Sequence, residues 1–314
     1  MLFLYITLIA IFIYLLLCFI IFIGIFCTRF KKDQDIYNIP KGKHYDEHRN
    51  EMIKLIDEFK CVEYEDIYIK SHDNKTLHAK YYKISDDNVV DICFHGYRGT
   101  SVRDFCGGRI IPSITKHNMI IVDERGHGQS QGFYLSMGLK ERYDCIYWVK
   151  YAIDRFGEDC KIMLYGVSMG ASTVLFASGM NLPSNVKGII ADSPYCSVKE
   201  IIKKVCEKDF HVPWFLVSHF IFVGALLFGH FNIYKGDVSK GIISAKVPIL
   251  LIHGEDDQFV PPYMSKIMQG CNMDKIKLIT FKNAGHGISF MEDKERYIKE
   301  VCNFIKSCEQ KKTT

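Results

Sequence analysis

The longest apolar segment is the first one. No residue from Leu2 to Cys27 has a charged side chain. As a helix, this run would be about 39 Å long at about 1.5 Å per residue, enough to cross a bilayer with some tilt. A cleaved signal peptide would need a basic start, a shorter apolar stretch and small residues at the cut, whereas this run follows Met1 directly and ends at Phe26-Cys27. We therefore predict an uncleaved transmembrane helix within an anchor of residues 1–28.

Basic residues flank this anchor on one side. Arg29, Lys31 and Lys32 follow it directly, and no side-chain charge precedes it. By the positive-inside rule, this asymmetry predicts an outside N-terminus and a large domain in the cytoplasm. We expect residues 29–60 to form a polar juxtamembrane neck.

One face of this neck is apolar. Met52, Leu55, Ile56 and Phe59 have the spacing of an amphipathic helix. We expect this helix to pack on the domain that follows it. Binding to the membrane surface is the alternative.

Short apolar segments alternate with longer helical segments from residue 61 onward. The expected strands are 67–69, 77–82, 89–94, 119–122, 162–165, 188–191, 248–252 and 276–281. The clearest helical segments are 139–156 and 168–178. This alternation predicts an α/β fold, in which helices cover both faces of a mostly parallel central sheet. We assign residues 61–314 to this one domain.

Composition narrows the class of protein. The chain has 314 residues and a formal charge of +4 without a long basic block, so we expect no nucleic-acid partner. Its 12 cysteines form no C-x-x-C pair and show no finger-like spacing with histidine. Scattered thiols of this kind are typical of a reducing compartment. We expect neither a metal site nor an organic cofactor.

One pentapeptide has the pattern of a nucleophile elbow. Gly166-Val167-Ser168-Met169-Gly170 is G-x-S-x-G, and it follows an expected strand and opens an expected helix. The two glycines permit a sharp turn that lifts the Ser168 hydroxyl above the sheet, at a helix N-terminus. A chance glycine–serine turn would give the same pentapeptide, so the partners of Ser168 decide between the two interpretations.

Two later loops supply such partners. A serine hydroxyl needs a base to accept its proton and a third group to orient that base. The adjacent Asp256 and Asp257 follow the expected strand 248–252, and His286 lies between two glycines after the last strand. Both loops are at the C-terminal ends of strands, where open α/β sheets form their active sites. His286 is the candidate base, and either aspartate is a candidate for the orienting acid.

An oxyanion hole requires backbone N–H groups that point at the developing negative oxygen. The Met169 amide, next to the candidate nucleophile, is one expected donor. The Tyr97 amide, in the loop His95-Gly96-Tyr97 after an early strand, is the other. We interpret His95 as a structural residue.

The segment Asp123–Ser130 is rich in polar side chains. It has no paired metal-ligand spacing, and H-E-x-x-H does not occur in the sequence. We interpret it as a structural loop held by Asp123 and Arg125, near the mouth of the site.

Taken together, these motifs resemble those of the α/β-hydrolase superfamily. Within it, the chain is similar to the bacterial membrane-anchored serine hydrolases related to the serine aminopeptidase and monoacylglycerol lipase group. The matching segments, in family order, are His95-Gly96, Asp123–Ser130, Gly166–Gly170, His253–Pro261 and Gly285-His286.

The resemblance implies an α/β-hydrolase fold with a helical cap and a catalytic triad of Ser168, Asp257 and His286. The family pattern selects Asp257 rather than Asp256 as the acid. Glu124 departs from the pattern, because relatives often have an aromatic residue there.

A second apolar run, Val212–Ile233, is long enough to suggest another membrane span. A single crossing would separate Ser168, which precedes the run, from His286, which follows it. We therefore expect residues 194–245 to form the cap insertion of this superfamily. Its aromatic residues are candidates for an apolar roof that binds substrate, in particular Trp214, Phe215 and Phe220. The alternative is that the apolar residues of the cap form a surface that contacts lipid.

The function expected from these features is hydrolysis of carboxylic esters with an apolar acyl part, through an acyl-enzyme. The substrate would be a small-molecule or lipid ester, taken in part from the membrane. The same triad would also serve a serine peptidase, an amidase or a thioesterase. A non-catalytic membrane-bound binding protein is the alternative of another class. We further expect that removal of residues 1–28 leaves activity on soluble short-chain esters intact.

Overall fold

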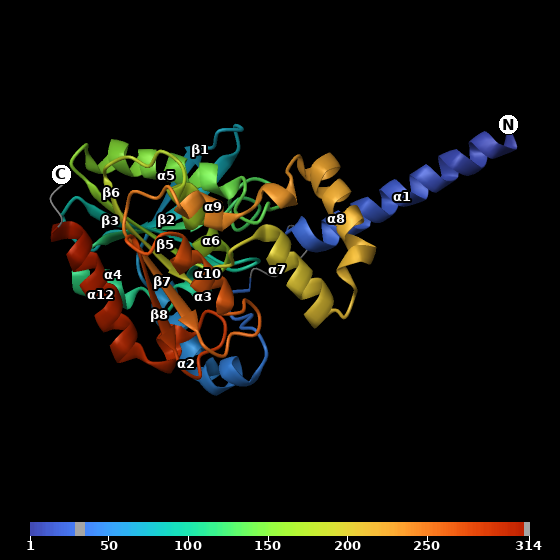
Figure 1. The fold of residues 1–314 in the computed structure, drawn as a ribbon. Coiled ribbons are helices and arrows are strands. Elements are labelled where there is room, and N and C mark those ends of the chain that lie inside the picture. Colours follow the sequence, from blue (N-terminus) through green and yellow to red (C-terminus); the bar gives the residue numbers. More distant parts are fainter. Residues whose placement is uncertain (29–34, 311–314) are drawn as a thin grey trace.

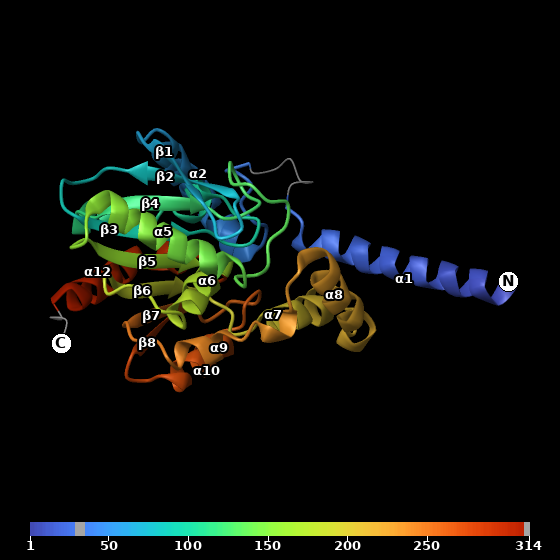
Figure 2. The same cartoon turned by 90° about the horizontal axis from the view of Figure 1, so that it is seen from above.

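A single twisted sheet forms the centre of the molecule (Figures 1 and 2). The computed structural model describes residues 1–28 and 35–310. Within them the sheet has eight strands in the order β1-β2-β4-β3-β5-β6-β7-β8. Strand β2 is antiparallel to both neighbours, and the pairs from β4 to β8 are parallel. The bounds are β1 (Glu65–Lys70), β2 (Thr76–Tyr82), β3 (Val89–Phe94), β4 (Asn118–Asp123), β5 (Lys161–Val167), β6 (Val186–Asp192), β7 (Ile249–Gly254) and β8 (Ile276–Phe281).

Helices cover both faces of this sheet, as the alternation of strands and helices predicts (Figure 2). On one face lie α5 (Glu141–Phe156), α6 (Met169–Ser178) and α10 (Tyr263–Cys271). On the other lie α2 (Lys43–Lys60), α3 (Ser101–Asp104), α4 (Ile110–Thr115), α11 (Ser289–Glu292) and α12 (Lys294–Gln310). The predicted fold class is confirmed.

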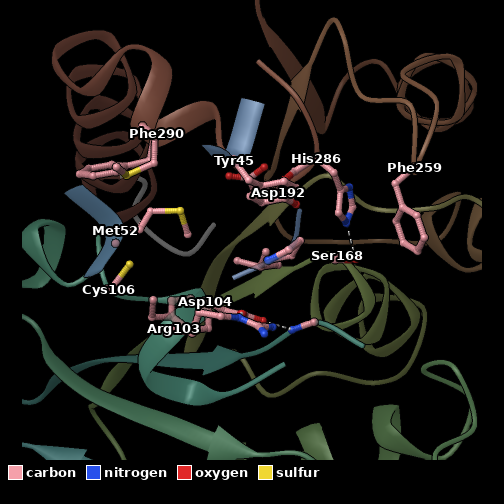
Figure 3. Close-up of a pocket in the computed structure, with 18 of the residues that line it drawn as sticks. Tyr45, Met52, Arg103, Asp104, Cys106, Ser168, Asp192, Phe259, His286 and Phe290 are labelled. Carbon is pink, nitrogen blue, oxygen red and sulfur yellow. Dashed lines mark hydrogen bonds and ion pairs between the residues drawn. The ribbon is translucent and has the colours of Figure 1, made fainter. Parts of the chain in front are cut away.

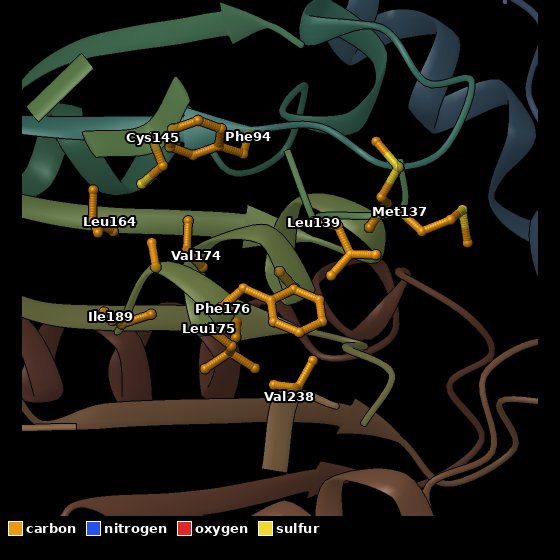
Figure 4. Packing of buried hydrophobic residues seen from close by; sticks show 14 of the residues in the cluster. Phe94, Met137, Leu139, Cys145, Leu164, Val174, Leu175, Phe176, Ile189 and Val238 are labelled. Carbon is orange, nitrogen blue, oxygen red and sulfur yellow. The ribbon is translucent and has the colours of Figure 1, made fainter. Parts of the chain in front are cut away.

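Alternation along the strands explains the two layers of core. In β4, Ile120 and Val122 belong to the core on the α5–α6 side, whereas Met119 and Ile121 belong to the core on the α2–α12 side. Successive side chains of a strand point to opposite faces, so a strand that is apolar at every position builds both cores. Figure 4 shows the α5–α6 side, where Phe94 of β3 and Leu164 of β5 pack near Cys145 of α5 and Val174 of α6.

A helical insertion lies between β6 and β7, within the expected cap segment. Its elements are α7 (Val198–Lys204), the π-helix η1 (Val205–Asp209), α8 (Trp214–Gly229), the short 3-10 helix η2 (Ile233–Lys235) and α9 (Val238–Ile242). Helix α8 has 16 residues, fewer than the roughly 20 that a bilayer crossing needs. It lies beside α1 (Leu2–Phe26) in both views, so the second apolar run packs on the first (Figures 1 and 2).

Helix α1 is long and apolar enough to cross a membrane. Its N-terminal part projects away from the rest of the molecule (Figure 1). The apolar side chains of this part are exposed. Its C-terminal part is different, because Cys18, Phe22 and Phe26 are buried and the two phenylalanines belong to the core on the α5–α6 side. Gly224 of α8 permits this packing, since a Cβ atom there would be 2.6 Å from the Cys18 carbonyl oxygen.

The end of α1 is also held by hydrogen bonds from the domain. The Tyr97 hydroxyl donates to the Ile25 carbonyl at 2.6 Å. The Arg98 guanidinium donates to the Gly24 carbonyl at 2.8 Å and to the Cys27 carbonyl at 3.1 Å. These bonds satisfy carbonyl groups that a helix C-terminus leaves without partners. The C-terminal end of the anchor is thus part of the folded domain.

The part of the neck that the structure describes also packs on the domain. Met52, Ile56 and Phe59 of α2 are buried in the core on the α2–α12 side, so the helix packs on the domain as predicted. Helix α2 of the neck is thus packed into the folded domain. Arg29, Lys31 and Lys32, on which the predicted orientation rests, lie outside the described residues.

Candidate active site at the β5–α6 turn

Ser168 occupies a strained turn between β5 and α6. Its backbone has φ 55° and ψ −113°, outside the regions that a non-glycine residue normally adopts. The flanking glycines make the turn possible. A Cβ atom on Gly166 would lie 2.3 Å from the Gly170 carbonyl carbon, and one on Gly170 would lie 2.0 Å from the Phe94 carbonyl oxygen. The G-x-S-x-G spacing is therefore a steric requirement of this strand–turn–helix connection.

This steric requirement predicts a large loss of stability for Gly170→Ala. The added methyl group would collide with the backbone of β3, which cannot move without breaking the sheet, so we expect a loss of about 3–5 kcal/mol. Gly270→Ala in α10 is the matched control, because a Cβ atom there has no neighbour within 4 Å, and its effect should be below about 1 kcal/mol. Urea unfolding of both variants measures the difference, and similar stabilities would contradict the account of the turn.

Three side chains from separate loops converge at this turn. Figure 3 shows two of them, with the His286 imidazole pointing toward Ser168. His286 Nε2 lies 2.8 Å from Ser168 Oγ, and His286 Nδ1 lies 2.7 Å from Asp257 Oδ2. Asp257 is buried and Asp256 is exposed, so the structure brings Asp257 to the histidine. This is the arrangement in which a carboxylate orients an imidazole that faces a serine hydroxyl.

The electrostatic environment couples His286 and Asp257. Burial disfavours the charged form of His286, but the Asp257 carboxylate outweighs burial and raises the histidine pKa above its ordinary value of 6.5. Burial also opposes ionisation of Asp257, but His286 and His253 outweigh it and hold the aspartate pKa well below its usual range. Asp257 is therefore a carboxylate at neutral pH.

Further contacts fix the positions of this pair. Asp257 Oδ1 accepts hydrogen bonds from the Phe259 and Val260 amides at 2.9 and 2.8 Å. His253 Nε2 lies 3.3 Å from Asp257 Oδ2. On the other side, the Tyr45 hydroxyl donates to the His286 carbonyl at 2.6 Å. Sequence reasoning missed the contribution of Tyr45, because it comes from α2, 241 residues away in the chain.

The two amides expected as oxyanion donors, those of Met169 and Tyr97, belong to segments that adjoin Ser168. Met169 is the first residue of α6, whose first-turn amides have no intrahelical acceptors. The loop that contains Tyr97 abuts the serine, because a Cβ atom on Gly96 would be 3.3 Å from Ser168 Cβ. Asp104 accepts a hydrogen bond from the Gly96 amide at 2.8 Å and thereby anchors this loop. Within residues 35–310, neither the Tyr97 nor the Met169 amide donates a hydrogen bond to a protein group.

Asp104 is itself kept ionised. Burial alone would raise its pKa, but the Arg103 guanidinium, whose Nε lies 2.8 Å from Asp104 Oδ1, holds the pKa of the carboxyl below its usual value. The loop anchor is therefore a charged acceptor, which makes a stronger hydrogen bond with an amide than a neutral one does.

Two cavities meet at Ser168 within the described residues. The first has a volume of about 370 Å³ and is partly polar, with Tyr45, Arg103, Asp104 and Asp192 among its lining residues (Figure 3). The second has a volume of about 540 Å³ and lies between α1, α7, η1 and α8, with mostly apolar walls. Tyr97, Ser168 and Phe259 border both cavities. Each volume is within the range of about 300–1,000 Å³ typical of small-molecule sites.

The cap residues expected to bind substrate are not in these cavities. Trp214, Phe215 and Phe220 line neither one. Phe215 is 77% exposed, and the Phe220 ring packs on Tyr14 of α1 with a centroid separation of 5.3 Å. Val217 and Ile221 face the apolar cavity instead. The three aromatic residues thus lie outside both cavities, because α8 presents other side chains to the apolar one.

The polar loop Asp123–Ser130 is held as interpreted. The Arg125 guanidinium donates two hydrogen bonds to Asp144, at 2.7 and 2.6 Å, and Asp123 Oδ2 lies 2.7 Å from His78 Nδ1. His95 is buried, and its Nε2 accepts a hydrogen bond from the Glu124 amide at 3.1 Å. Among the described residues, no group of three His, Cys, Asp or Glu side chains is placed to hold a metal ion.

Comparison with known proteins defines the class to which this fold and site belong. The fold resembles the Pyrococcus furiosus esterase Pf2001, with a TM-score of 0.66 and 22% identity over 80% of this chain and 94% of that one. It also resembles Est1E of Butyrivibrio proteoclasticus, solved with ferulic acid, with a TM-score of 0.61 and 20% identity over 78% and 100% of the chains. The fold is that of the α/β-hydrolases, as the sequence motifs imply.

Sequence comparison gives the family. A profile of the prolyl oligopeptidase family matches residues 116–312, well over half of the chain. The protein belongs to this family, within the α/β-hydrolase superfamily.

Individual relatives come from bacteria and yeasts. The chain is 27% identical to the uncharacterized protein YqkD of Bacillus subtilis, over 60% of this chain and 62% of YqkD. It is 25% identical to an uncharacterized membrane protein of Saccharomyces cerevisiae, over 56% of this chain and 57% of that protein. It is 24% identical to the protein bem46 of Schizosaccharomyces pombe, over 78% and 77% of the chains. The match thus covers less than two thirds of the length of the first two relatives.

Proposed function

We propose that this protein is a membrane-anchored serine hydrolase that cleaves carboxylic esters through an acyl-enzyme. The observation that carries the proposal is the continuous hydrogen-bonded chain from Ser168 Oγ through His286 to Asp257, at 2.8 and 2.7 Å. Such a chain converts a weakly nucleophilic hydroxyl into an attacking group, because the base accepts the proton as the new bond forms.

The proposed reaction has two steps. Ser168 Oγ attacks the ester carbonyl carbon while its proton moves to His286 Nε2, and Asp257 stabilises the resulting imidazolium. The Tyr97 and Met169 amides stabilise the negative oxygen. The carbon–oxygen bond to the alcohol then breaks, and the alcohol leaves with the proton from His286. In the second step, His286 removes a proton from water, which attacks the acyl carbon. The bond from this carbon to Ser168 Oγ then breaks, Oγ regains a proton from His286, and the carboxylic acid leaves.

The cavities support an ester with an apolar acyl part. An aminopeptidase needs a free acidic group to bind the terminal ammonium of a peptide, and the lining carboxylates that the structure describes already have partners. Asp104 bonds Arg103, and Asp192 accepts a hydrogen bond from the Tyr297 hydroxyl at 2.8 Å. The second cavity offers mainly hydrocarbon surface, which favours the binding of acyl chains.

The family membership makes peptide or amide hydrolysis the second candidate. Full-length protein in detergent should hydrolyse p-nitrophenyl butyrate with a burst of p-nitrophenol, the kinetic sign of acyl-enzyme accumulation. Aminoacyl and prolyl p-nitroanilides should be hydrolysed at least ~10²-fold more slowly. If the anilides, which are less reactive in themselves, gave an equal or larger kcat/KM, the enzyme would be a peptidase.

The raised pKa of His286 predicts the pH dependence of this activity. Only the neutral imidazole accepts the serine proton, and a pKa above 6.5 keeps the protonated form present to higher pH. The value of kcat/KM should therefore fall on the acid side with a midpoint above pH 6.5. A pH profile of p-nitrophenyl butyrate hydrolysis measures this midpoint, and a midpoint at or below 6.5 would contradict the assigned coupling between His286 and Asp257.

The proposed location follows from α1 and the basic residues after it. Helix α1 could span a membrane, and Arg29, Lys31 and Lys32 favour a domain on the cytoplasmic side. Proteolysis of intact cells and of inverted membrane vesicles tests this orientation. Cleavage of the domain in inverted vesicles alone is the expected result, and cleavage in intact cells would reverse the assignment.

A further inference from the structure

The anchor helix forms one wall of the apolar cavity. Ile21, Gly24 and Ile25 of α1 line this cavity together with Val217 and Ile221 of α8. Ser168 borders the same space, so a single apolar volume connects the reactive hydroxyl with the side of the membrane helix. A simple tether would have no reason to contribute side chains to the site.

This wall is held in a fixed position relative to Ser168. The Tyr97 hydroxyl bonds the Ile25 carbonyl, and Tyr97 itself borders both cavities beside the serine. Arg98 bonds the Gly24 carbonyl and lines the apolar cavity. These hydrogen bonds fix the end of α1 to the loop that carries the proposed oxyanion donor.

The outer surface of the cap continues the apolar surface of α1. Helix α8 lies alongside α1, and its Phe215, Leu216, Leu226 and Leu227 side chains are between 44% and 77% exposed. The N-terminal turns of α1 have the same character, with exposed apolar residues on all sides. An exposed apolar helix beside a membrane-spanning one is stabilised when both contact lipid, because the acyl chains remove its side chains from water.

We propose that the apolar cavity binds the acyl chain of a membrane lipid ester, and that this chain enters from the bilayer between α1 and α8. This inference rests on the proposed esterase function and adds the substrate class and the route. The last two turns of α1 are then part of the substrate-binding site. Acyl chains that fill the cavity gain binding energy with each methylene group, so kcat/KM should rise by about two- to fourfold per added methylene until the cavity is full.

Gly24 provides a direct test. It lines the cavity, and a Cβ atom there meets no other atom within 4 Å, so a side chain can begin at this position without a collision with the rest of the molecule. Gly24→Phe should occupy space that a long acyl chain needs. Ile20→Phe is the matched control, because Ile20 is an exposed residue of the same helix and lines neither cavity.

The variants are compared in phosphatidylcholine proteoliposomes with 4-methylumbelliferyl butyrate and palmitate. We expect Gly24→Phe to lower the palmitate-to-butyrate ratio of kcat/KM at least ~10-fold, and Ile20→Phe to leave the ratio unchanged. Val217→Phe, on the opposite wall, should lower the ratio as well. Fluorophosphonate labelling of each variant verifies that its active site is folded. Labelled variants with an unchanged ratio would overturn the acyl-cavity assignment and leave the esterase proposal intact.

A second arm tests the route. The palmitate ester is placed either in the proteoliposomes that contain the enzyme or in separate vesicles that contain none. Hydrolysis at least ~10-fold faster in the first arrangement supports entry from the bilayer, because the ester need not cross water. Equal rates in both would show that the ester arrives through water and would overturn the route. The failure of the wild type to hydrolyse either ester or to react with the probe would instead refute the proposed function.

Discussion

Replacement of Ser168 with alanine should lower kcat for p-nitrophenyl butyrate at least ~10⁴-fold. The variant retains the backbone amides and both cavities, so substrate binding should change little and the loss should lie in kcat rather than in KM. Direct attack of water on bound ester would account for the residual rate. Steady-state kinetics of purified full-length protein in detergent measures both parameters.

A serine on the same helix provides the control for this variant. Ser178 is buried at the far end of α6, and its hydroxyl donates to the Leu175 carbonyl at 2.7 Å. Ser178→Ala should change kcat less than about twofold, because this hydroxyl is remote from the proposed chemistry. A Ser168→Ala protein that retained more than a tenth of the wild-type kcat would exclude Ser168 as the nucleophile.

Replacement of Asp257 with asparagine should lower kcat about 10³- to 10⁴-fold. The amide has nearly the same shape as the carboxylate, but it cannot stabilise the imidazolium of His286 and favours the wrong tautomer. Because the carboxylate also raises the pKa of His286, the acid limb of the pH profile should move to lower pH in this variant. The kinetic loss and the direction of the pH shift are independent consequences of one contact.

The neighbouring aspartate is a closely matched control. Asp256 has the same side chain one position earlier, and it is exposed. Asp256→Asn should therefore leave kcat within about twofold of the wild type and should not move the acid limb. The reverse result, with Asp256→Asn inactive and Asp257→Asn active, would show that the acid was assigned incorrectly.

The sequence contained most of the information about the sheet and the proposed triad. Apolar strands flanked by turns could be located because parallel strands are buried on both faces. The turn at Ser168 could be located because Gly166 and Gly170 are sterically required there. The choice between Asp256 and Asp257 came only from the family resemblance, since two adjacent carboxylates after one strand cannot be distinguished by spacing.

Other features of the site depend on long-range packing that leaves no periodic signal. Helix α8 is apolar on all sides, so its sequence does not show which face meets the cavity, and the aromatic residues expected to form a roof line neither cavity. For the same reason, the sequence does not show that α1 lines the cavity. Helix α1 is apolar throughout, and such a sequence is compatible with contact to lipid and with contact to protein. Tyr45 was missed because its hydroxyl bonds a backbone carbonyl, which carries no sequence signature.

The most direct test of the central claim is the site of covalent modification by a fluorophosphonate. Wild-type protein is labelled, digested and mapped by mass spectrometry. We predict one phosphonyl group on the peptide that contains Ser168, with labelling that disappears in Ser168→Ala and slows strongly in His286→Ala. A folded wild-type protein that remains unlabelled, or an adduct on a different residue, would contradict the assignment of Ser168 as the nucleophile.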